Sequence, residues 1–303
     1  MGVINSYDRS LTNRLMGNET LALILCTVRD RQQRHKTYNL ETAFGSRSEW
    51  VLCHLGLLAF MPQSRRRSTQ NKLLRALSQE EYDRLLPYLE FVTLPFKHVL
   101  YEPNQPVDYV YFLNHGVISM VTITEEGETV EAATIGNEGM AGIHVLLGVS
   151  QLSLQAIAQV AGDGMRMRVD AFRREATPET RLYELLLRYI QAMISQLSQT
   201  VACNRLHSVE ERCCRWLLMC HDRVPSDEFF LTQELLSQML GVRRASVSVV
   251  AAILQKAGLI TYSRGRIRIL DRPGLESAAC ECYRLMKTEF DRLLGDQLND
   301  LEE

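Results

Sequence analysis

The chain has 303 residues, of which 46% are hydrophobic and 23% are charged, and its formal net charge at neutral pH is −2. This composition is typical of a folded globular protein with room for two domains, and it excludes a disordered or fibrous chain. The sequence has no apolar run of roughly eighteen residues and no secretory signal at its start, so we expect a cytoplasmic protein without membrane contact.

The cysteines do not follow a known metal-binding pattern. They form no CxxC pair and have no histidine at zinc-finger spacing, so we expect no metal site and no cofactor. Scattered thiols are typical of a reducing cytoplasm, where most are small buried hydrophobic groups. A redox role for Cys213–Cys214 or for Cys280-Glu281-Cys282 is the alternative, although neither pair has the basic neighbourhood of a reactive thiol.

Residues 1–70 hold several arginines but no sustained periodicity. We expect a poorly ordered N-terminal extension here. The alternative is a basic arm that contacts nucleic acid.

Residues 71–177 predict a small antiparallel β-roll. The segment begins with leucines at helical spacing, where Ser78 is a plausible N-terminal cap. Apolar and polar residues then alternate over 91–142 and again over 152–172, with turns between them and many β-branched and aromatic residues. Together with the helices that follow, this pattern predicts an α+β fold.

Residues 178–206 predict a long central helix with two apolar stripes. One stripe can cover the roll, and the near-heptad spacing makes a second copy of the helix the natural partner for the other. The dimer contact is assigned to Leu182, Leu186, Tyr189, Met193, Leu197 and Val201. The alternative is that both stripes belong to the core of one chain.

Residues 207–275 predict a winged helix-turn-helix domain. A helix capped by Ser208 comes first, and a second helix capped by Thr232 ends at Gly241, which can adopt the positive φ of a tight turn. A third helix starts at Arg243, and an alternating segment over 259–269 follows, with Arg264-Gly265 at its tip. This order is that of a helix-turn-helix with a wing. The remaining residues, 276–303, predict a C-terminal helix.

The charge of this domain differs from that of the whole chain. From Gly241 to Arg272 there are seven arginines and lysines and one acid, which is the electrostatic footprint of DNA binding. Small residues at the start of the third helix suit entry into the major groove, whereas Val247, Val250, Ile253 and Leu254 are expected in the core. The predicted DNA-binding residues are Thr232, Gln233, Arg243, Arg244, Ser246, Ser248, Arg264, Arg266 and Arg268.

The order of a strand roll, a long helix and a winged helix-turn-helix resembles the Crp/Fnr family of bacterial transcription regulators. The resemblance covers roughly residues 71–294 and rests most firmly on LTQELLSQMLGVRRASVSVVAAILQKAGLI. It implies a homodimer that reads double-stranded DNA half-sites one helical turn apart, and that contacts or excludes RNA polymerase.

The resemblance carries over unevenly to the recognition residues. Arg244 falls where the family often places an arginine that donates to guanine, and Ser246 falls at a hydroxyl position used for phosphate. Ala245 and Val249 stand where the family often has glutamate and arginine, which puts the family's well-known operator in doubt.

The effector region departs further from the family pattern. Cyclic-nucleotide-binding members carry a Gly-Glu pair and an Arg-Ser or Arg-Thr pair, whereas here Glu138 precedes Gly139 and no arginine or lysine lies between Met120 and Gly164. A phosphate would lack a compensating cation, so we expect a cyclic-nucleotide-binding-like roll with an unknown small-molecule effector. A haem at His98, His115 or His144, or an iron–sulfur cluster in this cysteine-free roll, is not expected.

The leading hypothesis is therefore a dimeric, DNA-binding transcription regulator. The alternative is a ligand-sensing or protein-interaction signalling module that uses the β-roll without sequence-specific DNA binding. An enzyme is not expected, because the sequence has no nucleophile elbow, no phosphate-binding glycine loop and no HExxH motif.

Overall fold

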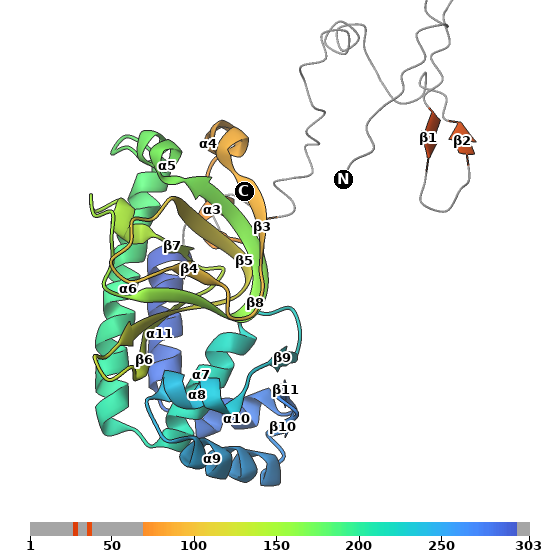
Figure 1. Cartoon of the computed structure of the whole chain (residues 1–303), viewed down its shortest axis with the longest axis vertical. Coiled ribbons are helices and arrows are strands. Elements are labelled where there is room, and N and C mark those ends of the chain that lie inside the picture. Colours follow the sequence, from red (N-terminus) through yellow and green to blue (C-terminus); the bar gives the residue numbers. More distant parts are fainter. Residues whose placement is uncertain (1–26, 30–34, 38–68, 296–303) are drawn as a thin grey trace, which may run out of the picture. The chain divides into compact units, whose positions relative to one another are not determined.

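A computed structural model of the chain describes residues 27–29, 35–37 and 69–295 (Figure 1). Contacts divide the chain into two compact units, Met1–Pro62 and Gln63–Glu303. In the first unit, β1 (Thr27–Arg29) and β2 (His35–Thr37) pair antiparallel. Most of the predicted N-terminal extension, and with it the alternative of a basic arm, lies outside the described residues.

The second unit begins with the predicted β-roll, an antiparallel sheet with strand order β3-β8-β5-β6. The short strands β4 and β7 pair with β8 and β5, respectively. The strands are β3 (Glu90–Leu94), β4 (Val99–Tyr101), β5 (Tyr109–Ile123), β6 (Thr129–Ile135), β7 (Met140–Ala141) and β8 (Gln155–Arg168).

Short helices flank the roll. They are α3 (Lys72–Arg75), α4 (Gln79–Leu85), η2 (Leu86–Tyr88), η3 (Ile143–Val145) and α5 (Val169–Glu175). Ser78 caps α4 as predicted, because its Oγ accepts a hydrogen bond from the Glu81 N–H at 3.2 Å. Contacts of the roll already include Thr69, before the predicted start at residue 71: buried Thr69 donates to the side chain of Asn114 at 3.0 Å.

Two helices connect the roll to the C-terminal domain. The long helix α6 (Arg181–Leu206) runs beside the roll and continues to the level of α7 (Val209–His221), as Figure 1 shows. A capping box between Ser208 and Glu211 starts α7 and separates it from α6. The helices of the described residues are all too short or too polar to span a bilayer.

The C-terminal domain contains the predicted helix pair and wing. Its elements are β9 (Glu228–Phe230), α8 (Gln233–Leu240), α9 (Arg244–Lys256), β10 (Ile260–Ser263), β11 (Arg266–Ile269), α10 (Arg272–Ala278), α11 (Cys282–Phe290) and the π-helical turn η4 (Asp291–Gly295). The C-terminal part differs from the single expected helix over 276–303. The helical path breaks at Ala279, whose backbone is extended (φ −82°, ψ 154°), so that α11 turns back along α6.

Two hydrophobic clusters form the core of the second unit. One fills the roll and includes residues of α6. The other fills the C-terminal domain and includes Trp216 of α7 together with Val117, Val121 and Val160 of the roll. The roll and the C-terminal domain therefore share an apolar interface. Burial of these apolar side chains away from water stabilises the contact between the two domains.

A buried ion pair reinforces this interface. Arg223, which follows α7, donates to both carboxylate oxygens of Glu138 in the loop after β6, at 3.1 and 2.6 Å. Its third contact is with Thr134 Oγ1 at 2.7 Å. A Cβ at Gly136 would overlap the Arg223 side chain, so this loop needs glycine for the arginine to approach.

A second polar contact joins β6 to α7. Buried Glu131 accepts hydrogen bonds from Ser119 Oγ at 2.5 Å and from Trp216 Nε1 at 3.0 Å. Burial raises the pKa of the Glu131 carboxyl to about 7, although its hydrogen bonds oppose that shift. This carboxyl therefore titrates near neutral pH.

Removing the charge of Glu138 by Glu138→Gln is expected to lower the free energy of unfolding by about 3 kcal/mol, because the substitution leaves a buried guanidinium without its counter-ion. Urea denaturation measures the change. The matched control is Glu90→Gln, which breaks the exposed pair with Arg166 and should cost less than about 1 kcal/mol. Equal losses for both variants would contradict the structural role of the buried pair.

The Glu131 carboxyl makes stability depend on pH. Because its pKa is raised from 4.5 to about 7 in the folded chain, its stabilising contribution is complete at low pH and is lost as the pH rises through that range. The free energy of unfolding of the wild type should therefore fall by up to about 3 kcal/mol, relative to Glu131→Gln, between pH 5 and pH 8. Urea denaturation at both pH values tests this, and parallel pH profiles for the two proteins would rule it out.

Candidate nucleic-acid interface

The helix-turn-helix is built from local sequence signals. Thr232 caps α8, because its Oγ1 accepts from the Leu235 N–H at 3.2 Å. Gly241 ends α8 in the left-handed conformation at φ 61°, and Arg243 occupies the N-cap position of α9. Glycine adopts this conformation without steric cost, which is why the turn between the two helices is so short.

One face of α9 is exposed along its whole length. Arg243, Arg244 and Ser248 lie on this face, and Ser246 is half-buried. Val249 is exposed as well, at 60%. The expectation that Ile253 lies in the core is wrong: it is 43% exposed, and Ala251 is buried instead, because the buried stripe runs through Val247, Val250, Ala251 and Leu254.

The side chains of Gln233 and Ser248 connect the two helices. Ser248 Oγ donates to Gln233 Oε1 at 2.8 Å and also contacts the carbonyl oxygen of Arg244 at 3.2 Å. The Gln233 carboxamide is thereby oriented beside the start of α9, with its N–H groups still able to donate. Gln233 and Thr232 are both half-buried at this edge.

The wing is a tight hairpin. Arg264 and Gly265 both have positive φ values, 50° and 77°, at the two central positions between β10 and β11, as a two-residue type I′ turn requires. Arg266 and Arg268 are exposed on β11, but both pair with Glu228 on the neighbouring strand β9, at 3.3 and 2.9 Å. Glu228 was not predicted, because it lies outside the basic segment and reaches it only through strand pairing.

The remaining predicted arginines are not neutralised by a neighbouring acid among the described residues. Within the described part of the chain, Arg243, Arg244 and Arg264 have no ion-pair partner. A depression of about 320 Å³ lies between the start of α9 and the wing tip; its lining includes Arg244, Arg264, Thr232 and Gln233. Tyr262 forms part of its wall, and burial raises the pKa of this tyrosine to about 12, so it is a neutral group there. The depression thus presents two cations and several hydrogen-bonding groups.

The predicted dimer residues are divided between two faces of α6. Leu182, Leu186 and Tyr189 are fully buried against the roll, and half-buried Met193 packs on the same cluster, so these four face their own chain rather than a partner. This stripe is therefore the one that covers the roll, whereas the prediction from the sequence assigned it to the dimer contact. Only Leu197 and Val201 of the predicted set are exposed, at 40% and 72%. They continue a stripe that also contains exposed Leu187 and Ile194 and half-buried Ile190.

A buried ion pair and a cavity lie beside the loop after β6, in the effector region of the roll. Arg223 reaches the loop after β6, and Glu138 compensates its charge. A cavity of about 230 Å³ lies beside this pair; its lining includes Gln196 of α6 and Tyr283 of α11. Lys72 and Lys287 also line this cavity. The sequence reveals that the segment from Met120 to Gly164 lacks a cation, but not that an arginine beyond α7 reaches it.

The histidines of the roll occupy separate surroundings. His98 is exposed, and His115 Nδ1 lies 3.3 Å from Asp163 Oδ2. His144 is buried beside the ring of Tyr101, and burial lowers its pKa to about 4, so it is neutral at physiological pH.

Among the described residues outside the roll, one group of side chains has the chemistry of a metal site. Cys203 and His207 at the end of α6 meet Cys280 and Cys282 before and at the start of α11, with ligand atoms within 4.8 Å of one another. No such site was expected from the sequence, because the two pairs are far apart in the chain and neither has a zinc-finger spacing. The sequence feature that could have indicated this site is the spacing of Cys203 and His207, which are four residues apart and therefore lie on one face of a helix.

Comparison with protein families matches both domains. The model of the Crp-like helix-turn-helix domain matches residues 211–278, and the model of the cyclic nucleotide-binding domain matches residues 91–177. No curated protein matches the chain in sequence.

Solved structures share the fold. FixK2 from Bradyrhizobium japonicum superposes with a TM-score of 0.54 at 15% identity, covering 63% of this chain and 98% of its own. A CRP/FNR-family transcriptional regulator from Thermus thermophilus gives 0.52 at 20% identity, with 63% and 98% covered. The c-di-GMP responsive global regulator CLP from Xanthomonas campestris gives 0.51 at 13% identity, with 64% and 100% covered.

The two domain matches occur in the order that the resemblance implied, and the fold is that of known regulators along almost their full length. The chain therefore has the domains of a Crp/Fnr-like transcription regulator, a cyclic-nucleotide-binding-like domain followed by a Crp-like helix-turn-helix domain.

Proposed function

We propose that this regulator binds operator DNA as a homodimer, with α9 of each protomer in the major groove and the wing beside it. The observation that carries the proposal is the exposed start of α9, where Arg244 lines the same depression as Arg264. Arg243, Arg244 and Arg264 have no ion-pair partner in the described part of the chain. A helix of this kind fits a groove about 12 Å wide, and its small exposed residues let the backbone approach the bases.

The predicted contacts fall into two classes. Arg244 can donate two hydrogen bonds to guanine O6 and N7, and Gln233 can donate to a neighbouring base or phosphate, since Ser248 holds its carboxamide in place. Arg264 at the wing tip, with Thr232 beside the same depression, suits a phosphate. Arg266 and Arg268 add to phosphate binding where DNA displaces Glu228.

The exposed stripe of α6 supports the dimer. Leu187, Ile190, Ile194, Leu197 and Val201 are spaced by three, four, three and four residues, which is the heptad spacing of a coiled coil. Leu187 and Ile194 were not in the predicted set, whereas Leu197 and Val201 were. A dimer through this stripe would present two α9 helices to half-sites about one helical turn apart.

The roll is proposed to sense a small molecule other than a cyclic nucleotide. Support comes from the Arg223–Glu138 pair, which leaves the guanidinium near the effector loop without spare charge for a phosphate. The regulator then acts by contacting or excluding RNA polymerase at its operator.

Replacing the proposed base-reading arginine tests DNA binding. Operator fragments are first selected by the wild type from random genomic DNA, and their affinity is then measured by fluorescence anisotropy over a range of salt concentrations. Arg244→Ala should weaken specific binding about 5- to 150-fold, and Arg264→Ala should weaken binding to all sequences and reduce the salt slope by about one.

The control is Arg284→Ala, which removes an exposed arginine of α11 and should leave both affinity and salt slope unchanged. If the wild type selects no fragment with salt-sensitive, saturable binding, with or without cell metabolites, the signalling-module alternative is favoured instead.

Charge placed in the exposed stripe tests the dimer. Ile194→Glu with Leu197→Glu should convert the dimer to a monomer, because the added carboxylates would face their counterparts across an apolar seam. Size-exclusion chromatography with light scattering measures the mass. The matched control is Gln191→Glu with Ser198→Glu, which adds the same charge at two exposed positions next to the stripe and should remain dimeric. A wild-type monomer, or a stripe variant that stays dimeric, would refute this interface.

A further inference from the structure

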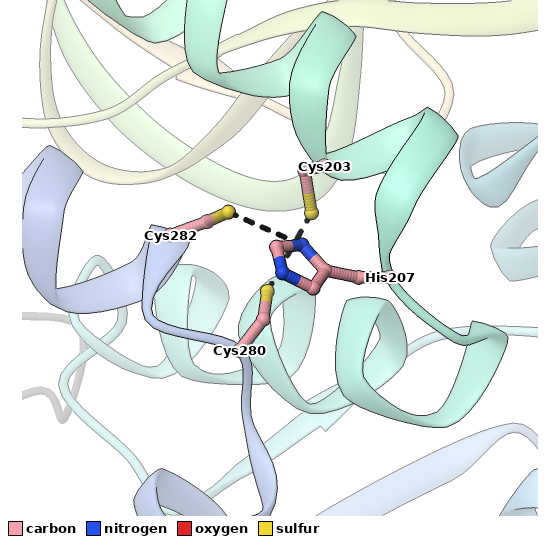
Figure 2. Close-up of side chains that lie close together, drawn as sticks. All are labelled: Cys203, His207, Cys280 and Cys282. Atoms are coloured by element: carbon pink, nitrogen blue, oxygen red, sulfur yellow. Dashed lines mark hydrogen bonds between the residues drawn. The ribbon is translucent and has the colours of Figure 1, made fainter.

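Four metal-ligating side chains converge where α6 ends and α11 begins. Figure 2 shows Cys203 and His207 projecting from the end of α6 toward Cys280 and Cys282 on the segment that leads into α11. The three cysteines are buried and His207 is half-buried. Cys203 and Cys280 are 77 positions apart in sequence, yet their sulfur atoms lie 3.5 Å apart.

The distances fit one ion at the centre of the cluster. The sulfur of Cys282 lies 3.4 Å from His207 Nδ1, and all four ligand atoms lie within 4.8 Å of one another. A tetrahedral zinc ion with bonds of about 2.3 Å to sulfur and about 2.0 Å to nitrogen separates its ligands by about 3.5 to 3.8 Å. Small side-chain adjustments therefore complete the tetrahedron.

Groups around the cluster are arranged as in metal centres. His207 Nε2 lies 3.3 Å from a carboxylate oxygen of Glu281, which leaves Nδ1 as the ligand atom. A carboxylate on the second nitrogen of a ligating histidine fixes its tautomer and orientation. Gln199 Nε2 donates to the sulfur of Cys282 at 3.0 Å, which is the contact a thiolate ligand accepts.

Two buried arginines lie near the cluster and can offset its charge, although Arg215 also interacts with the buried Glu131 carboxyl. Arg212 and Arg215 are 8% and 5% exposed, and neither has a carboxylate within ion-pair distance in the part of the chain that the structure describes. Arg212 lies close enough to interact electrostatically with Cys203 and Cys280, and Arg215 does so with Cys203. Three thiolates around a divalent cation carry one net negative charge, which these guanidinium groups can offset.

We propose that Cys203, His207, Cys280 and Cys282 form a mononuclear, tetrahedral Zn²⁺ site. Three thiolates and one imidazole in this geometry favour zinc over the oxygen-preferring cations. A two-iron cluster requires its ligands on two separate irons, which sets them farther apart than one ion does. On binding, the three thiols release their protons to solvent, and the neutral imidazole donates its lone pair.

The four ligands lie on either side of the helix-turn-helix domain in the sequence. Two ligands precede the matched helix-turn-helix domain at residues 211–278, and two follow it. His207 is the residue at which α6 ends, with an extended backbone (φ −105°, ψ 151°) before α7 begins. The ion therefore ties both ends of the DNA-binding domain to the end of the central helix.

The test uses the full chain, reduced and freed of metal by a chelator, and titrated with Co²⁺ as a spectroscopic probe and then with Zn²⁺. We expect one Co²⁺ per chain, with the intense ligand-field bands of a tetrahedral site and thiolate-to-cobalt charge-transfer bands, all removed by one equivalent of Zn²⁺. Zinc should also raise the thermal unfolding midpoint of the wild type.

Three variants assign the ligands. Cys280→Ser should weaken the thiolate-to-cobalt charge-transfer bands and lower the affinity for Co²⁺, because it leaves two of the three thiolates. Glu281→Gln, at a residue whose side chain is 57% exposed, should keep the fold and lower zinc affinity about 10- to 100-fold. The matched control is Cys220→Ala, which removes a buried thiol of α7 outside the cluster and should leave metal binding unchanged. Circular dichroism verifies that each variant is folded.

The proposal is overturned if the reduced, folded wild type takes up no Co²⁺, or if its cobalt spectrum is octahedral and lacks thiolate bands. Retention of full affinity in Cys280→Ser and Glu281→Gln would overturn it equally. A metal-free protein that instead forms a Cys203–Cys280 disulfide on mild oxidation would replace the metal site by a redox pair. None of these measurements involves DNA, so their failure is distinct from a failure to bind an operator.

Discussion

The buried ion pair between Arg223 and Glu138 fixes the contact between the roll and the helix-turn-helix domain, on top of the apolar interface that they share. The arginine also holds the roll through its backbone, since its carbonyl oxygen accepts from the Gly116 N–H at 2.8 Å. Because both charges are buried, the pair is stable only when the loop after β6 and the end of α7 keep their present positions. A ligand that rearranges this loop must also change the position of the end of α7. Because α7 packs directly on α8 and α9, such a change would reach the helix-turn-helix.

The central helix α6 shows why one sequence pattern can have two interpretations. Both of its stripes are apolar, and spacing alone does not reveal which one the roll covers. Packing decides this: the face through Leu182, Leu186 and Tyr189 enters the roll core, and the face through Leu187 and Val201 remains outside. Assigning a partner to the first face was wrong because periodicity records amphipathicity but not the identity of the neighbour.

Local signals predicted most of the remaining fold. The strands of the roll, the caps at Ser78, Ser208 and Thr232, and the turn at Gly241 all depend on residues within a few positions of one another. The contacts that were not predicted join distant segments: the buried ion pair, the acid beside the wing, and the cysteines on either side of the helix-turn-helix. Such pairs leave no periodicity in the sequence, because the chain between them sets their geometry only after it has folded.

Under the proposed function, the acid beside the wing affects how the protein meets DNA that is not its target. At long range, Glu228 offsets part of the attraction of Arg266 and Arg268, so a random duplex is drawn mainly by the helix tip and the turn. Only a close, well-aligned backbone can compete for the two guanidinium groups. On that function, Glu228 would shorten the time that the protein spends on non-target DNA.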